Sequence, residues 1–340
     1  MTENNHIPVF YEGQDDLIEI LATSMASVCY TTKSFIDFYI LDCGICDFNK
    51  RQLEGMKEKF NNFSLEFIPI DLKQFEGLKG WGNANFLDCY SRLLIPGLKP
   101  ELDKVIYLDT DTIALGDIKK LWDIDLGDYP YGAAPELGYS EILFENCKKN
   151  LGISEKHIYP NAGVLLINCT KWRECNAEKD LLDSANKFKD KLIVINEELL
   201  SIFWGKNNYK KLDLMYNISD RINRVKCTNF PEITDEYVET QWNKAILQHL
   251  TPTKPWLFLR NELGKPARNA SNFWRFAAMT PYYEGLQNKY IRHCAETFRY
   301  VPTSAKKTEY RLFNLIPLIK KSSKWIKIFG FIPFIKVKEK

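Results

Sequence analysis

Two aspartates, Asp109 and Asp111, come directly after an apolar run at residues 105–108, and their spacing could hold a metal ion. Residues two apart in an extended backbone project from the same face, so both carboxylates leave the chain together. Two like charges this close repel each other unless a cation lies between them. Carboxylate oxygens at the end of a strand suit Mn²⁺ or Mg²⁺, which also bind water and phosphate oxygens. An Asp-x-Asp after a strand is also common in ordinary acidic turns, so the motif needs support from the rest of the chain.

The hydrophobic pattern around these aspartates predicts an open α/β sheet. Strand-like patterns lie at residues 6–11, 36–41, 65–70, 105–108, 131–134, 163–168 and 245–249, and helical patterns at 17–30, 47–60, 87–94, 117–122, 178–190 and 197–203. Strands that alternate with helices are typical of a sheet covered by helices. Such sheets bind their ligands at the carboxyl ends of the strands, which is where the two aspartates lie.

The composition limits the class of protein. With 340 residues, of which 45% are hydrophobic, the chain can form one large α/β domain with or without an appendage. A net charge of +2 gives no general case for nucleic-acid binding. The C-x-x-C at Cys43 and Cys46 has no second pair at zinc-site spacing. Because the first residues also lack a signal-peptide pattern, we expect a reduced, cytoplasmic protein.

The last eighty residues differ from the rest. We expect a main domain at residues 1–260 and a helical extension at 261–340, whose last part is basic. Residues 301–340 contain ten Lys or Arg but only two acidic residues, and the basic residues are interspersed with large apolar ones. No apolar stretch there reaches the roughly 20 residues that cross a bilayer. Two interpretations remain open: a segment that docks on anionic lipid, or a helix that packs on the main domain with its lysines in solvent.

Five ordered segments resemble the retaining glycosyltransferases of family 8, which include bacterial lipopolysaccharide galactosyl- and glucosyltransferases and glycogenin. These segments are Tyr90-Ser91-Arg92-Leu93, residues 104–111, residues 121–128, residues 161–168, and His249 with Lys254-Pro255-Trp256. The resemblance covers about residues 7–260 and implies a GT-A fold, a Rossmann-like mixed sheet flanked by helices. It also implies transfer of a sugar, most often UDP-linked, to an acceptor hydroxyl with Mn²⁺ and with retention of configuration.

The resemblance also assigns roles to single residues. The metal ligands would be Asp109, Asp111 and His249. The nucleotide-sugar would also contact Tyr11, Gln14, Asp16, Arg92, Thr110, Asn161, Ala162 and Lys254, while Glu136, Asn196 and Glu197 would surround the reacting sugar. The metal and Lys254 would stabilise the negative charge that grows on the β-phosphate as the sugar–oxygen bond breaks.

Two departures from the family pattern bear on the donor. Gln14 stands where an Asp usually reads the uracil ring, and Glu12 replaces a small residue; an amide can still donate and accept hydrogen bonds. Asn196-Glu197-Glu198 replaces the usual Asp-Gln-Asp at the head of a helix. A carboxylate at Glu197 could stabilise an oxocarbenium-like transition state or attack as a nucleophile, and we favour charge stabilisation.

We therefore expect a Mn²⁺-dependent retaining hexosyltransferase, with Mg²⁺ as the alternative metal, that extends lipopolysaccharide, capsule or a glycoprotein. Its partners would be a UDP-sugar, a glycan or glycolipid acceptor and an anionic membrane surface, at the inner face of which the protein would be peripheral. Two alternatives stay open: a transferase that acts on a soluble or self-attached glucan, and a sugar-nucleotide-binding protein that has lost catalysis. The intact set of Asp109, Asp111 and His249 argues against the second.

Overall fold

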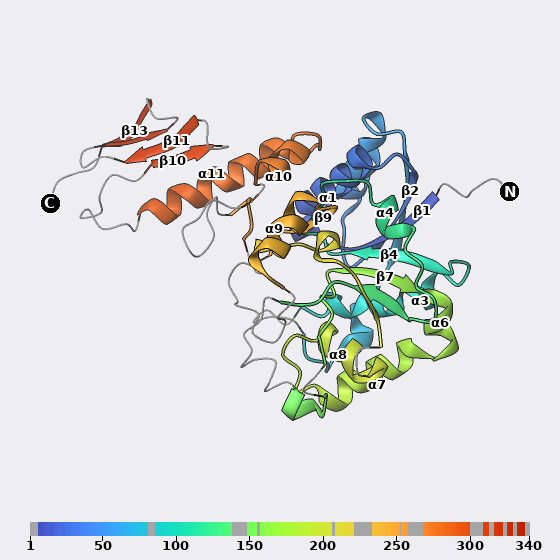
Figure 1. The fold of residues 1–340 in the computed structure, drawn as a ribbon. Coiled ribbons are helices and arrows are strands. Elements are labelled where there is room, and N and C mark those ends of the chain that lie inside the picture. Colours follow the sequence, from blue (N-terminus) through green and yellow to red (C-terminus); the bar gives the residue numbers. More distant parts are fainter. Residues whose placement is uncertain are drawn as a thin grey trace.

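The computed structural model describes residues 6–80, 86–137, 148–154, 157–205, 208–220, 233–251, 253–257, 268, 270–299, 309–312, 316–321, 325–328 and 332–336. A seven-stranded sheet in the order β3-β2-β1-β4-β7-β6-β8 forms its centre (Figure 1). The strands are β1 (His6–Gly13), β2 (Phe35–Asp42), β3 (Phe63–Pro69), β4 (Lys104–Leu108), β6 (Tyr131–Ala133), β7 (Val164–Asn168) and β8 (Lys210–Lys211). β3, β2, β1 and β4 run parallel, whereas β7 is antiparallel to both β4 and β6. The predicted mixed α/β sheet is therefore confirmed.

Helices cover both faces of the sheet and explain why β4 is apolar throughout. Ile106 and Leu108 enter one hydrophobic core, while Val105 and Tyr107 enter the other. Side chains alternate between the faces of a strand, and a strand buried on both faces needs apolar residues at every position. The first core receives α1 (Ile18–Thr31) and α2 (Asp47–Gly55), and the second receives α3 (Ile95–Leu98), α6 (Cys169–Glu174), α7 (Ala177–Phe188) and α8 (Asn196–Trp204).

After β1, the strands β2 and β3 are added on one side of the sheet, whereas β4 is added on the other side of β1. β1 pairs with β2 on one side and with β4 on the other, so the crevice at their carboxyl ends lies at a topological switch point. A second, two-stranded sheet joins β5 (Thr112–Ala114) to β9 (Leu247–His249), with Thr112 opposite His249. This pairing brings a histidine from late in the chain next to the Asp-x-Asp.

One of the expected short helices lies where the sequence predicts it but is a 3₁₀ helix instead of an α-helix. The expected helix at 87–94 is a 3₁₀ helix (Asp88–Leu94) that continues into α3. Further 3₁₀ helices are Asp15–Leu17, Met56–Glu58, Leu72–Phe75 and Leu214–Tyr216, and the described part of the main domain also includes α4 (Lys119–Trp122) and α9 (Asp235–Asn243). β5, α6 and α9 were not predicted; the first two are shorter than the window in which periodicity can be read.

The C-terminal extension begins with helices and ends with strands. α10 (Ala270–Ala277) packs on α1 through Phe273 and Phe276, and α11 (Tyr283–Arg299) follows it. Both agree with the expected helical extension. The boundary expected between residues 260 and 261 lies outside the described residues.

The basic tail forms a four-stranded antiparallel sheet beyond α11 (Figure 1). Its strands are β10 (Glu309–Leu312), β11 (Ile316–Lys321), β12 (Trp325–Ile328) and β13 (Ile332–Lys336). The tail helix that was one of our two interpretations is therefore wrong for these segments. Isoleucine favours strands, and Pro317 and Pro333 lack the N–H that a helix interior needs. None of the helices in the described part of the chain is both long and apolar enough to span a membrane.

Candidate active site

A cavity of about 610 Å³ opens at the carboxyl ends of β1 and β4. Nearly all residues that the sequence singled out line it, although they come from distant parts of the chain. They are Gln14, Asp16, Arg92, Asp109, Thr110, Asp111, Glu136, Asn161, Ala162, Asn196, Glu197, His249 and Lys254. The convergence of so many polar side chains on one large cavity makes it the candidate active site.

Tyr11 is an exception and requires a correction. Its side chain is fully buried, and its hydroxyl lies 2.8 Å from the hydroxyl of Ser24 on α1. Strand alternation explains this position, because Glu12, the next residue of β1, lines the cavity while Tyr11 points to the opposite side. The structure therefore gives Tyr11 a packing role rather than a lining role.

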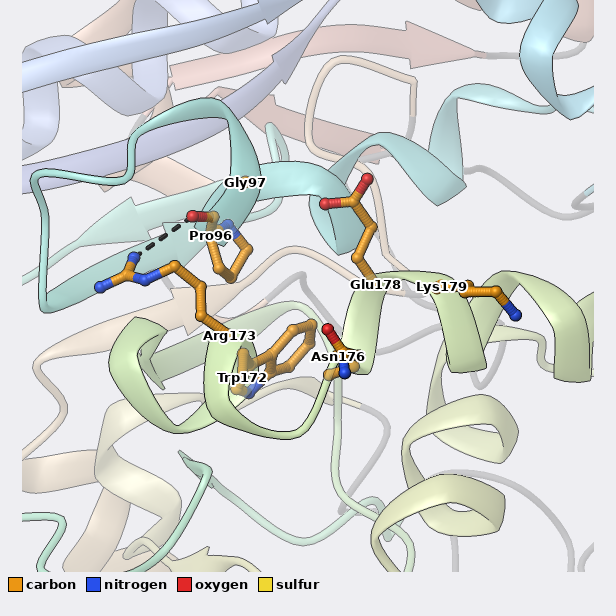
Figure 2. A pocket seen from close by; sticks show the side chains of 8 residues that line it. Pro96, Gly97, Trp172, Arg173, Asn176, Glu178 and Lys179 are labelled. Atoms are coloured by element: carbon orange, nitrogen blue, oxygen red, sulfur yellow. Dashed lines mark hydrogen bonds between the residues drawn. The ribbon is translucent and has the colours of Figure 1, made fainter.

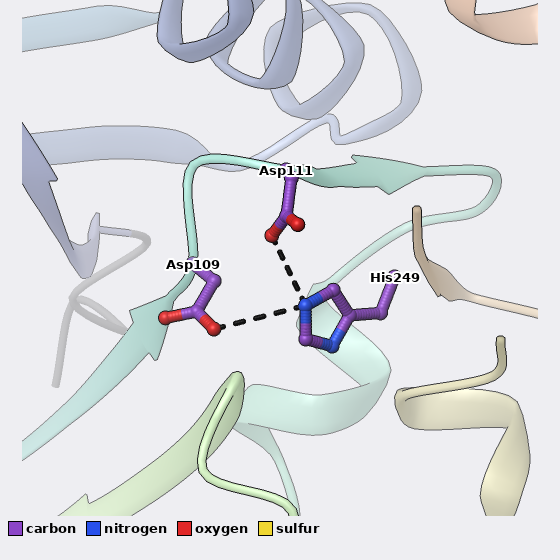
Figure 3. Close-up of side chains that lie close together, drawn as sticks. All are labelled: Asp109, Asp111 and His249. Carbon is purple, nitrogen blue, oxygen red and sulfur yellow. Dashed lines mark ion pairs between the residues drawn. The ribbon is translucent and has the colours of Figure 1, made fainter. Parts of the chain in front are cut away.

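Asp109, Asp111 and His249 converge at one end of the cavity (Figure 3). His249 Nε2 lies 3.0 Å from Asp111 Oδ1 and 3.7 Å from Asp109 Oδ2. The candidate ligand atoms of the three residues all lie within 4.8 Å of one another. One imidazole nitrogen and two carboxylates form a donor set that suits Mn²⁺ and similar divalent ions. The residues therefore fit the metal that the fold family implies.

A glycine makes room for this group. Gly163 lies just before β7, and its carbonyl accepts a hydrogen bond of 2.8 Å from the backbone N–H of Asp109. A Cβ at this position would lie 2.3 Å from Cε1 of His249 and 2.9 Å from Oδ2 of Asp109. The absence of a side chain at residue 163 is what allows the histidine and the aspartate to approach.

Lys254 lies beside the same carboxylates and pairs with Asp111. Burial alone would raise the pKa of Asp111, but Lys254 and His249 hold it well below its usual range. The ammonium group of Lys254 also lies 5.5 Å from the ring centre of Trp256. A cation at the edge of the metal group is placed to attract an anionic ligand such as a diphosphate.

Arg92 and Glu12 form a largely buried ion pair in the wall of the cavity. Nε of Arg92 lies 3.0 Å from Oε1 of Glu12, and Nη2 lies 3.1 Å from Oε2. Burial raises the pKa of Glu12 to about 7, although Arg92 acts to lower it. Burial would lower the pKa of Arg92, but Asp109 and Glu12 hold it well above its usual range.

The cavity is also lined by two carboxyl groups, Glu136 and Glu197, and by the amides of Asn161 and Asn196. Asn161 donates through Nδ2 to Glu136 and accepts through Oδ1 from Asn217 at 2.7 Å. Oε1 of Glu197 lies 3.4 Å from the backbone nitrogen of Ala162. Burial, together with the charge of Glu136, raises the pKa of Glu197 to about 8. Carboxyl and amide groups arranged in this way suit the hydroxyls of a sugar.

The turn before α8 fixes Asn196 and Glu197. Ile195, directly before them, has φ of 45°, a conformation that a β-branched residue rarely adopts. The carboxylate of the fully buried Glu198 accepts hydrogen bonds from the backbone N–H groups of Ile193 at 2.6 Å and Val194 at 3.0 Å. Strained backbone of this kind persists where its surroundings enforce it, often at functional sites.

Sequence reasoning did not identify several residues that shape the site. Asp88 accepts a hydrogen bond of 3.0 Å from Gln14, Tyr107 donates one of 2.8 Å to Asp109 Oδ1, and Asn217 holds Asn161. The sequence carried a signal for Tyr107 only, because it lies two residues before Asp109 and so shares its face of the strand. Asp88 and Asn217 reach the site through tertiary packing alone.

A second cavity, of about 340 Å³, lies between α3, α6 and the start of α7 (Figure 2). Arg173 points into it, but its guanidinium already donates to the carbonyls of Pro96 at 3.2 Å and Leu102 at 3.0 Å. Glu178 lies close to Gly97 on the other side. This cavity gathers none of the residues that the sequence marked for chemistry.

Comparison with known proteins supports these observations. A family model described as glycosyl transferase family 8 matches residues 8–260. A putative glycosyltransferase of Haemophilus influenzae is 28% identical over 222 residues, which cover 64% of this chain and 66% of that protein. Glycosyltransferase GlyF of Streptococcus pneumoniae is 28% identical over 236 residues, which cover 69% of this chain and 54% of GlyF. The chain thus matches between about half and two thirds of the length of these relatives.

Solved structures show the same fold. The galactosyltransferase LgtC, solved in complex with donor and acceptor sugar analogues, superimposes with a TM-score of 0.69 at 24% identity. The match covers 83% of this chain and 100% of LgtC. Glycosyltransferase GlyE of Streptococcus pneumoniae gives a TM-score of 0.58 at 20% identity, with 90% of this chain and 68% of GlyE covered. At these identities the likeness establishes the shared GT-A architecture.

Proposed function

Because this chain belongs to glycosyltransferase family 8, we propose that it transfers a hexose from a UDP-sugar to a hydroxyl of a surface-glycan acceptor with retention of configuration. The observation that carries this proposal is the cavity in which Asp109, Asp111, His249 and Lys254 face a pocket of sugar-compatible groups. A nucleoside diphosphate needs cations, which Lys254 and a divalent ion held by Asp109, Asp111 and His249 would supply, and a hexose needs the carboxyl and amide groups in the rest of the cavity.

The metal end would hold the donor diphosphate. Asp109, Asp111 and His249 would bind Mn²⁺, or Mg²⁺ in its place, with oxygen and nitrogen donors that suit both the ion and its remaining phosphate ligands. A bound divalent ion supplies Lewis-acid stabilisation of the departing diphosphate. The ammonium group of Lys254 would bind the same phosphates and stabilise the charge that develops there.

The sugar end would bind and stabilise the hexose. Glu136, Asn161 and Asn196 line this part of the cavity; the carboxylate of Glu136 can accept hydrogen bonds from hydroxyls, and the two amides can both donate and accept. As the bond to the diphosphate breaks, positive charge develops at the anomeric carbon. A carboxylate at Glu197 would stabilise that charge, and the growing charge in turn favours the ionised form of Glu197.

The nucleotide would lie over the end of β1. Gln14, Asp16 and Thr110 line the cavity there, and the amide of Gln14 already donates to Asp88. Its carbonyl oxygen can still accept a hydrogen bond from a base such as uracil.

The acceptor would be a glycan or glycolipid at the inner face of a membrane. The tail carries ten basic residues against two acids between residues 301 and 340, mixed with isoleucine, phenylalanine and tryptophan. Basic residues near an anionic surface contribute roughly 1 kcal/mol each to binding. We therefore propose that the tail docks on anionic lipid and brings the cavity to lipid-linked acceptors.

The proposal is tested by Mn²⁺-dependent release of UDP from a panel of UDP-sugars, with the Asp109→Ala/Asp111→Ala double variant as control. We expect slow hydrolysis of one donor, which chelation and the double variant both abolish, and faster release when a suitable glycan is added. Donor binding without turnover across a broad acceptor panel would instead support a binding protein. Release from no UDP-sugar with either metal, together with no binding of UDP, would refute the proposal.

A further inference from the structure

Arg92 is almost fully buried, and most of its hydrogen-bonding capacity is already used within the protein. The residue is 6% exposed, and its guanidinium lies 4.4 Å from the ring centre of Tyr107. Nε and Nη2 donate to the two carboxylate oxygens of Glu12, and Nη1 donates to the carbonyl of Ala162 at 3.0 Å. Nη1 also lies 3.1 Å from Oδ1 of Asp109.

These contacts leave little of Arg92 for a bound nucleotide-sugar. A guanidinium has five N–H bonds, and the contacts with Glu12, Ala162 and Asp109 use about four of them. A bidentate contact with a phosphate would require Arg92 to release Glu12 or Asp109. The N–H groups of Arg92 therefore mainly bind other groups of the protein.

The two oxygens of Asp109 have different surroundings. Oδ1 accepts a hydrogen bond of 2.8 Å from Tyr107 and lies next to Arg92, whereas Oδ2 faces His249 at 3.7 Å. Figure 3 shows this division, with one carboxylate oxygen directed at the histidine ring and the other directed away from it. Oδ1 thus anchors the side chain, and Oδ2 remains for the metal.

We propose that Glu12 is a positioning residue for the metal site, which acts through Arg92 on Asp109. Glu12 clamps one side of the guanidinium with two parallel bonds, so that the other side is aimed at Asp109 Oδ1. Parallel bonds of this type fix orientation as well as position. This proposal rests on the proposed metal-dependent function, and it assigns a role to a carboxylate that stands where the family has a small residue.

Removal of the Glu12 carboxylate should lower the affinity for the metal more than it lowers the stability of the fold. Without Glu12, the only hydrogen-bonding partners left to the guanidinium among those described are Asp109 and Ala162, and the group can turn over the ring of Tyr107. Asp109 would then be held less firmly, and Oδ2 would spend less time at the metal position. Groups that orient metal ligands typically change metal affinity by about 10- to 100-fold when they are lost.

The test measures Mn²⁺ binding to the purified full-length chain by titration calorimetry without nucleotide, together with thermal unfolding of each variant. Glu12→Gln should raise the Kd for Mn²⁺ about tenfold or more. Glu12→Asp keeps the charge but shortens the side chain by one methylene, so it tests whether the carboxylate must reach Arg92. It replaces Glu12→Gln as the test if that variant does not fold. We expect it to weaken Mn²⁺ binding as well.

Two controls complete the experiment. Glu239→Gln breaks a similar paired contact at the surface, where Arg268 donates to both Glu239 oxygens at 2.8 Å, and it should leave Mn²⁺ binding unchanged. Arg92→Lys should weaken binding, and adding Glu12→Gln to it should weaken binding no further, because Glu12 acts through Arg92.

Folded Glu12 variants that bind Mn²⁺ like the wild type, or losses that add up in the double variant, would overturn the proposal. Because the measurement does not depend on turnover, it remains decisive even if the protein hydrolyses no UDP-sugar. Wild-type protein that binds Mn²⁺ but releases no UDP would count against the proposed function alone.

Discussion

The backbone of Gly163 lies directly against the ring of His249. A Cβ on this glycine would come within 2.3 Å of His249 Cε1 and 2.7 Å of Nδ1. The backbone has little freedom to move away, because Gly163 is held by two hydrogen bonds. Its carbonyl accepts from the backbone N–H of Asp109, and its own N–H donates to Asn161 Oδ1 at 2.9 Å. One position without a side chain thus determines how closely His249 approaches β7.

Gly163→Ala should therefore weaken Mn²⁺ binding about tenfold or more, because the methyl group displaces a ligand rather than a flexible neighbour. Calorimetric titration with Mn²⁺ measures the effect. Gly55→Ala, in α2, provides the matched control, since no heavy atom lies within 4 Å of its added Cβ. Equal Mn²⁺ affinities of the two variants would show that Mn²⁺ binding does not depend on the observed positions of His249 and Asp109.

Glu197 should give the reaction a pH dependence. Its pKa of about 8 means that the carboxyl group of the free protein loses its proton as the pH rises through 8. If the ionised form stabilises the transition state, kcat/KM should increase across this range, because that constant reports groups of the free enzyme. Glu197→Gln should lower turnover about 100-fold and remove this inflection.

The control for Glu197 is Glu178→Gln, which changes another half-buried carboxyl with a raised pKa at the start of α7. It should leave the pH profile as it is. Near wild-type turnover of Glu197→Gln would exclude both charge stabilisation and nucleophilic attack by this residue.

His157 should make the protein less stable in acid. It is buried against α8, where its Nε2 lies 2.7 Å from Ser201 Oγ, which itself donates to the carbonyl of Glu197 at 2.6 Å. Burial, with a contribution from Lys148, lowers the pKa of His157 from 6.5 to about 4. The unfolded chain therefore takes up the proton first, and stability is lost as the pH falls from 6.5 towards 4.

The variant His157→Gln isolates this effect, because its amide can still donate to Ser201 but does not titrate. Urea unfolding should show that wild type loses about 2 kcal/mol relative to the variant between pH 7.5 and 5. Glu12 and Glu197 titrate in both proteins, so their contributions cancel in the comparison. A constant difference between the two proteins across this range would contradict the buried, neutral state of His157.

Local features of the site could be predicted from the sequence, but its tertiary features could not. Asp109 and Asp111 follow an apolar strand, which was readable from residues 105–108. The extended backbone expected between the two aspartates was wrong, because residues 110 and 111 form a turn in which the N–H of Thr112 donates to the carbonyl of Asp109 at 3.1 Å. His249 was found only through the resemblance. Its contact with Asp111 depends on the pairing of β5 with β9. The strand predicted at residues 245–249 contains β9, but β5 has only three residues and was not predicted, so the pairing could not be read from the sequence.

Three other outcomes show where pattern alone was insufficient. Tyr11 matched the binding turn of the family, but strand alternation turns it into the core and leaves Glu12 at the cavity. The role of Glu12 depends on Arg92, eighty positions later, which no local pattern connects to it. One interpretation of the tail was a helix, but the segments described there form the strands β10 to β13; docking of the tail on a membrane stays a prediction.

The tail also allows a direct experiment. Deletion of residues 301–340 should abolish sedimentation with anionic phosphatidylserine vesicles at low salt, because it removes ten basic residues. Uncharged phosphatidylcholine vesicles serve as the control and should bind neither protein. Vesicle binding that survives the deletion would place the membrane contact elsewhere on the protein.

On the proposed function, Asp109, Asp111 and His249 hold the divalent ion that binds the donor diphosphate. Anomalous diffraction at the manganese edge, from crystals grown with MnCl₂ and UDP, tests it most directly. We predict a strong anomalous peak that contacts Asp109 Oδ2, a carboxylate oxygen of Asp111, His249 Nε2 and the phosphates of UDP. UDP bound in the cavity without a manganese peak at these three side chains would contradict the account.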